Sequence, residues 1–175
     1  MKMCFTELKG DRLVFVIIRG SRVGNRGYVS DLNISEKVLM GIVRAAENFK
    51  RAHSAIFRRH GLTFQRYNVL RVLEASENGR NNISGVSRIM LVPGANITGI
   101  AKGLGRDGFI IRKSDPHDER ITLLQITPKG RGTLRNIENE KDRTIERILK
   151  AFSNNDLLDL LAKVKQIIKN TSQLA

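Results

Sequence analysis

The stretch GLGRDG at residues 103–108 has the glycine spacing G-x-G-x-x-G of a dinucleotide-binding loop. Such a loop needs a strand before the glycines and a helix after them, so that pyrophosphate can sit at the N-terminus of the new helix. Here the flanking residues predict the reverse order, with a helix entering and a strand leaving. Gly108 is better explained as the C-terminal cap of the entering helix, and we expect no bound nucleotide.

The sequence also contains glycine, histidine and serine residues that could belong to phosphate-binding, metal-binding or catalytic motifs. Gly99 is followed by Ile and Ala, which does not match the phosphate-binding pattern that ends in Lys and Ser or Thr. His60 and His117 do not belong to a cluster with zinc-ligand spacing. The sequence also shows no turn that would place a serine nucleophile beside a histidine. We therefore expect no metal, no cofactor and no enzymatic activity.

Positive charge is the strongest compositional signal. The 175 residues carry 31 Lys and Arg against 17 Asp and Glu, a formal net charge of +14, spread along the chain and not gathered in one tail. Such an excess favours a polyanionic partner, with a merely soluble basic protein as the alternative. No apolar run approaches the ~20 residues of a membrane span. The single cysteine, Cys4, suits a reducing compartment, so we expect a cytoplasmic protein without membrane contact.

Helical periodicity dominates from Asn33 onward, after an arm at residues 1–32 that is rich in turn formers. Asn33 and Glu36 resemble a capping box. The sequence predicts helices over 33–60, from Thr63 to the turn ENGR, over 83–91 after Asn82, over 95–107, from Pro128, and after the cap NND. The β-branched stretches FIIRKS (109–114) and RITLLQIT (120–127) predict a two-stranded hairpin.

The order helix, helix, turn, helix, hairpin is that of a winged helix–turn–helix. We predict a mainly α fold with a small β-hairpin wing, in which 61–127 form the DNA-binding lobe and the helices of 33–60 and 128–175 form a dimerisation region. In this arrangement the second helix of the turn motif enters the major groove and the wing can reach the adjacent minor groove. Long apolar stripes on the terminal helices favour a second subunit, with an intramolecular bundle as the alternative.

Several motifs then resemble the MarR family of bacterial transcriptional regulators. The most specific is DPHDER followed by β-formers and ITPKG, which matches the family's D-x-x-D-x-R…L-T-x-x-G. The stretch NIT at 96–98, followed by Leu104, Gly108 and an apolar pair, is similar to the family's recognition helix and its exit. The resemblance covers residues 34–172. It implies an obligate dimer in which the first, fifth and sixth helices of the two chains interleave.

The recognition helix and the helix before it supply the first DNA-binding candidates. Asn96 and Thr98 are placed to meet base edges, and Lys102 and Arg106 to meet phosphates. An ordinary solvated helix face is the alternative. Phosphate contacts are also expected from the preceding helix, through Ser84, Ser87 and Arg88.

In the wing, the resemblance makes Arg120 the arginine that inserts into the minor groove and Asp118 the carboxylate that orients it. The alternative is a surface ion pair worth at most ~1 kcal/mol. The sequence also departs from the family. Pro93 and Gly94 replace the usual Ser-Arg entry to the recognition helix, and Gly99 and Gly103 stand where polar side chains often occur. Glu119 replaces a second basic wing residue.

Relatives couple ligand binding or cysteine oxidation to the spacing of the two lobes. Cys4 lies far ahead of the first helix, so redox sensing is not expected. The family default is a small-molecule effector held between the dimer helices and the lobe. The candidate lining residues, which serve equally well as core, are His53, Phe57, Phe64, Tyr67 and Arg71.

Together these features predict a sequence-specific, DNA-binding transcriptional regulator, a ligand-responsive repressor that acts as a homodimer on a pseudo-palindromic operator in double-stranded DNA. Two alternatives remain open. The chain could be a non-specific architectural DNA-binding protein, or a protein-interaction module that uses its winged lobe to bind another protein.

Overall fold

The structure is a computed structural model, and it describes residues 31–116 and 118–174. Its internal contacts divide the chain into two units, Met1–Arg44 and Ala45–Ala175, and the lobe considered below lies wholly in the second. Residues 1–30 of the expected arm, including Cys4, and His117 of the expected wing lie outside the described residues.

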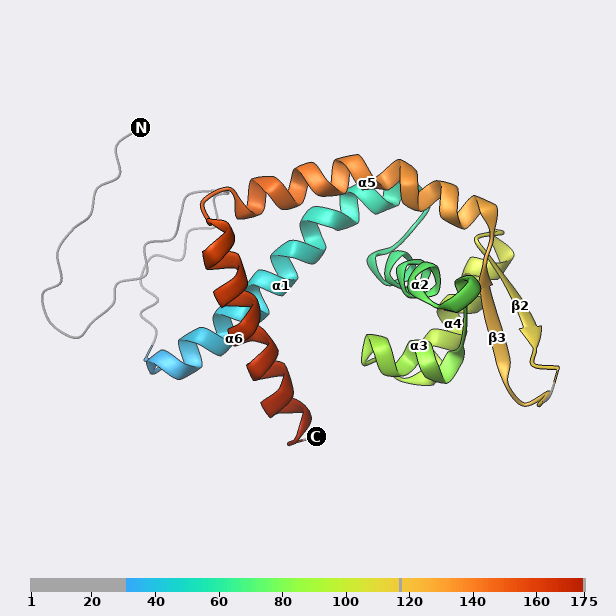
Figure 1. Cartoon of the computed structure of the whole chain (residues 1–175), viewed down its shortest axis with the longest axis horizontal. Coiled ribbons are helices and arrows are strands. Elements are labelled where there is room, and N and C mark those ends of the chain that lie inside the picture. Colours follow the sequence, from blue (N-terminus) through green and yellow to red (C-terminus); the bar gives the residue numbers. More distant parts are fainter. Residues whose placement is uncertain (1–30, 117, 175) are drawn as a thin grey trace, which may run out of the picture. The chain divides into compact units, whose positions relative to one another are not determined.

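The described chain is mainly helical, with a small antiparallel sheet (Figure 1). The helices are α1 (Ile34–Arg59), α2 (Phe64–Ala75), α3 (Ile83–Met90), α4 (Gly94–Arg106), α5 (Pro128–Leu149) and α6 (Asn154–Ser172), with a short 3₁₀ turn, η1 (Glu77–Gly79). The strands are β1 (Arg80–Asn82), β2 (Ile110–Ser114) and β3 (Thr122–Ile126). The predicted fold class, mainly α with a β-hairpin wing, is confirmed.

The helix ends follow the local signals in the sequence. The Asn33 backbone N–H donates to Glu36 at 2.9 Å and the Glu36 backbone N–H donates to the Asn33 side chain at 3.0 Å, as in a capping box. Thr63 and Asn82 cap α2 and α3 with side chains that accept a backbone N–H. The cap of α6 is Ser153, directly before the predicted NND, which therefore forms the first turn of that helix.

The sheet has three strands in the order β1-β3-β2. The hairpin runs in register from Ile110 opposite Ile126 to Ser114 opposite Thr122. The third strand, β1, was not predicted, since the sequence pattern placed Arg80 in the turn ENGR and Asn82 at a helix cap. Its residues, RNN, have weak strand propensity, and it forms through its pairing with the distant β3, where Asn81 lies opposite Leu124. The wing is thereby tied to the segment between α2 and α3.

The core of the lobe lies between α2, α3, α4, α5 and the sheet. Its buried members include Leu70, Leu73, Val86, Ile97, Ala101, Leu104, Leu124, Ile126, Leu134 and Ile137. The predicted inner face of α4, formed by Ile97, Ala101 and Leu104, is fully buried. Packing of this face fixes which side of α4 remains available to a partner.

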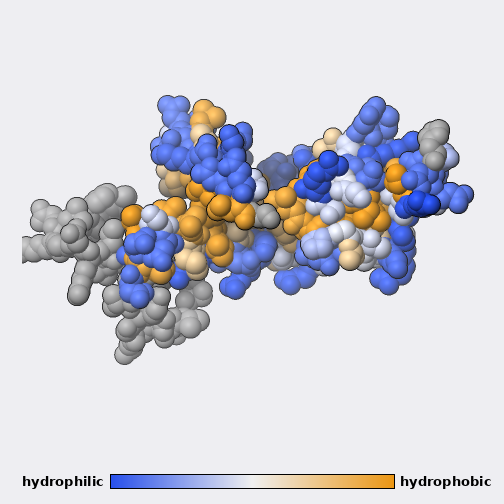
Figure 2. Space-filling model, turned by 90° about the horizontal axis from the view of Figure 1, so that it is seen from below, coloured by the Kyte–Doolittle hydropathy of each residue, from blue (hydrophilic) through white to orange (hydrophobic). Residues whose placement is uncertain are grey.

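Apolar side chains are also exposed on the long helices. No residue of α6 is buried, and Leu158 and Ile168 are 66% and 54% exposed. In α1, Val38 and Leu39 are about half exposed. Figure 2 shows such apolar side chains at the molecular surface. None of the helices in the described part of the chain is both long and apolar enough to cross a membrane.

Gly130, in the first turn of α5, tests how tightly this helix packs on the sheet. A Cβ atom at Gly130 would lie 2.5 Å from the Phe109 carbonyl oxygen and 2.7 Å from Ile126 Cγ1. We expect Gly130→Ala to lower the free energy of unfolding by about 1–3 kcal/mol, because the Phe109 carbonyl is held by bonds from Thr127 and the Ile126 side chain is buried in the core. Urea denaturation measures the change. Gly132→Ala is the control, since its Cβ would meet only the tip of Arg135 at 3.8 Å, and equal stability of the two variants would contradict this packing.

Candidate nucleic-acid interface

The outward face of α4 is opposite its buried face. Ala95, Gly99, Lys102 and Arg106 are three or four positions apart, so they share one side of the helix, and all four are exposed. The first two lack polar side chains, and a Cβ atom at Gly99 would meet nothing within 4 Å. The N-terminal half of this face therefore presents nearly bare backbone, and the C-terminal half presents two positive charges.

Asn96 and Thr98 flank this face near the start of α4. Asn96 is exposed, and an asparagine amide can form two hydrogen bonds with adenine. The Thr98 hydroxyl donates to the Gly94 carbonyl at 3.0 Å. Because its proton is used within the helix, Thr98 offers a partner its methyl group and an accepting oxygen.

Of the three phosphate-binding candidates on helix α3, two are exposed and the third bonds within the protein. Ser84 and Arg88 are exposed, as phosphate contacts require. Ser87 instead donates its hydroxyl to the Val92 carbonyl at 2.6 Å. This bond braces the turn between α3 and α4, and a contact of Ser87 with phosphate stays a prediction.

Asp118 shapes the turn of the wing. Its carboxylate accepts the backbone N–H of Arg120 at 3.0 Å, and its carbonyl accepts the N–H of Ile121 at 2.9 Å. These bonds fix the backbone that carries Arg120, whose side chain is exposed. Asp118 thus positions Arg120 through the main chain.

The structure adds two basic residues that were not singled out from the sequence. Arg112 and Lys113 of β2 are exposed. The Arg112 side chain passes 3.5 Å from the position of a Cβ on Gly105 of α4, so it extends the basic end of the recognition helix. Side chains alternate between the two faces of a strand, so the stretch FIIRKS already predicts that Arg112 lies on the same face as Ile110.

The predicted effector residues form an aromatic cluster. His53 is 1% exposed, its Nδ1 lies 2.9 Å from the Phe49 carbonyl oxygen, and its Nε2 is buried without a hydrogen-bond partner among the described residues. The Phe57 ring stacks on Tyr67 at 4.0 Å, and Phe64 lies 5.9 Å from Phe57. These rings pack against one another. The fifth candidate, Arg71, is exposed on α2.

Comparison with known proteins agrees with this geometry. Residues 60–121, from the end of α1 to the turn of the wing, match the MarR family. This stretch of the chain, which includes α2, α3 and α4, is similar to the MarR family of transcriptional regulators. The relatives described below are transcriptional regulators by name, in agreement with the prediction that the chain is not an enzyme.

Two relatives and one solved structure illustrate the range of similarity to known proteins. YdgJ of Bacillus subtilis, an HTH-type transcriptional regulator, is 32% identical over 82 residues, which are 45% of this chain and 50% of that protein, so the match spans only half of YdgJ. The regulator MhqR of Bacillus subtilis is 25% identical over 139 residues, 79% of this chain and 94% of MhqR.

The solved structure is Sco3205 of Streptomyces coelicolor, a MarR family regulator crystallised in complex with DNA. It has a TM-score of 0.71 at 17% identity and covers 80% of this chain and 89% of its own. At this identity the likeness establishes the shared fold.

We expect Arg120→Ala to weaken DNA binding about tenfold, the size of one well-formed arginine contact, and to leave the oligomeric state unchanged. Fluorescence anisotropy measures the affinity and sedimentation the oligomeric state. Arg58→Ala removes an exposed charge from the end of α1 and serves as the control. A dissociated or unfolded Arg120→Ala protein would refute a wing role for Arg120.

The substitution Gly99→Ala should change protein stability and DNA affinity in opposite directions. The added methyl group lies in open space, so we expect it to stabilise α4 by about 0.5–1 kcal/mol, the ordinary gain of Ala over Gly within a helix. If this face meets DNA, the same methyl group should weaken binding about tenfold, because it separates two closely packed surfaces. Thermal unfolding and anisotropy measure the two effects. A variant that is more stable and binds DNA unchanged would remove Gly99 from the interface.

Proposed function

We propose that this chain is a cytoplasmic, sequence-specific repressor that binds a pseudo-palindromic operator as a homodimer and is released by a small-molecule effector. The observation that carries the proposal is the outward face of α4. It is held on a buried scaffold, bare of side chains at Gly99, and flanked by the exposed amide of Asn96. A helix of this kind can approach base edges in the major groove.

The charge of the lobe supports specific over purely architectural binding. Residues 61–127 hold nine Lys and Arg against six Asp and Glu. Non-specific binding draws its free energy from phosphate neutralisation, and such a small surplus provides little of it. We therefore propose that base contacts from Asn96 and Thr98, together with Arg120, supply most of the preference.

The exposed apolar side chains of α1 and α6 support the dimer. Leu158 and Ile168 of α6 and Leu39 of α1 are each half exposed or more, and a second copy offers the same surfaces in return. A two-fold dimer places two recognition helices about 34–36 Å apart, one turn of DNA. Bound across a promoter, such a dimer would compete with polymerase, which is why we propose repression.

The cluster around His53 is the proposed effector site. A buried ring nitrogen is ordinarily paired, and Nε2 of His53 is not paired within the described chain. An effector that carries a hydrogen-bond donor would satisfy it after the rings of Phe57 and Phe64 separate.

The test is fluorescence anisotropy on DNA from the region upstream of the gene and on a scrambled duplex, at two salt concentrations. We expect a preference of ~10³ or more for the upstream DNA, with two chains per duplex by sedimentation. Equal, salt-sensitive binding to both duplexes would favour an architectural role. Absence of binding to either would favour a protein-interaction module.

A further inference from the structure

Asp107 stands in an unfavourable place for an acidic side chain. It caps the C-terminus of α4, with its backbone N–H bonded to the Gly103 carbonyl at 3.1 Å. The end of a helix carries partial negative charge and favours cations. Asp107 also lies next to Arg106, a candidate phosphate contact, where a carboxylate repels DNA. A specific partner must therefore explain its presence.

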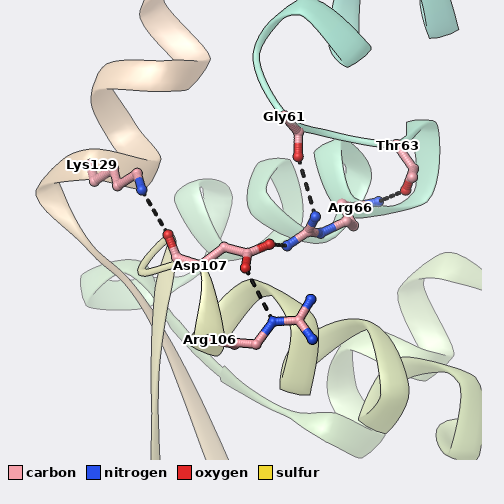
Figure 3. A network of polar contacts seen from close by, with 6 residues as sticks. All are labelled: Gly61, Thr63, Arg66, Arg106, Asp107 and Lys129. Carbon is pink, nitrogen blue, oxygen red and sulfur yellow. Dashed lines mark hydrogen bonds and ion pairs between the residues drawn. The ribbon is translucent and has the colours of Figure 1, made fainter.

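That partner is Arg66 of α2 (Figure 3). The Arg66 guanidinium donates to the Asp107 carboxylate and, at 3.2 Å, to the Gly61 carbonyl just beyond α1. The Arg66 side chain is only 18% exposed. The pKa of the Asp107 carboxyl is held below its usual value, first by the hydrogen bond from Arg66 and then by the bond from Arg106.

The same junction joins α4 to the wing and to α5. Lys129 of α5 donates to the Asp107 carbonyl at 2.7 Å, and its ammonium lies 4.8 Å from the centre of the Phe109 ring. The Arg66 guanidinium lies 5.8 Å from the same ring. It also lies 3.8 Å from where a Cβ on Gly103 would be, so the glycine leaves room for it. Four elements thus meet at Asp107 and Phe109.

We propose that Arg66 and Asp107 form a latch that sets the orientation of α4 in the lobe, and that sequence preference depends on this latch although neither residue reads a base. Helix α4 is rich in glycine and buries a single apolar stripe. The latch fixes its far end against α2. The consequence for DNA rests on the proposed function, whereas the latch itself can be observed without DNA.

Asp107→Asn gives the sharpest test, because two explanations predict opposite signs. If Asp107 acts only as a negative charge beside the phosphates, its removal should tighten binding to every duplex. If it holds α4 in place, affinity for the upstream DNA should fall about tenfold, the size of one charge-assisted hydrogen bond, while binding to scrambled DNA stays the same or rises. The control is Glu77→Gln, which removes the same charge from an exposed site in η1.

Arg66→Gln should reproduce the loss on upstream DNA, and the double variant should lose no more than either single variant, because both remove one contact. Arg66→Lys keeps the charge without the guanidinium fork and should give a smaller loss. In the free protein, amide exchange at Asp107, Gly108 and Phe109 should accelerate about tenfold in both single variants.

Unchanged amide exchange, additive losses, or tighter binding of Asp107→Asn to both duplexes would each overturn the latch. If the parent protein shows no sequence preference, the proposed function fails, and the exchange measurement still decides whether the latch holds α4.

Discussion

The burial of Ile97, Ala101 and Leu104 is the contact on which the rest of the structure depends. Four of the thirteen residues of α4 are glycine, and its N-cap, Pro93, makes no side-chain hydrogen bond to the helix. Such a sequence has weak intrinsic helix propensity. The helix therefore exists because the lobe supplies a groove for its apolar stripe, and because both of its ends are tied to other elements.

The glycines that make α4 a weak helix also give it its surface. Gly103 makes room for the Arg66 guanidinium, Gly105 lies under Arg112 of the wing, and Gly99 leaves the outward face bare. The glycines thus lower the intrinsic stability of α4 and let other groups approach its backbone closely on three sides. The packed core of the lobe offsets that cost. The glycine spacing of GLGRDG, which matches a nucleotide-binding loop, is therefore explained by packing around α4.

The positive charge of this chain is not concentrated in the lobe. The net charge of +14 belongs to the whole sequence, whereas the lobe is nearly balanced and the wing turn carries Asp115, Asp118 and Glu119. Long-range attraction to a polyanion is therefore a property of the entire molecule. Under the proposed function, sequence discrimination comes from a few side chains on a fixed backbone, such as Arg120 on the turn held by Asp118.

The sequence by itself determined what depends on neighbours a few residues apart. The caps at Asn33, Thr63 and Asn82, the apolar stripe of α4 and the hairpin all follow from short-range hydrogen bonds and periodicity, as does the family resemblance carried by the wing motif. Only the tertiary structure decided what depends on distant residues. Strand β1 exists through β3, and Arg66 meets Asp107 across 41 positions. The bond from the Ser87 hydroxyl to the Val92 carbonyl, and the bond from the Arg120 backbone N–H to the Asp118 carboxylate, were likewise not predicted. A side chain's type indicates what it can bind, but its partner is fixed by which distant segments the core brings together.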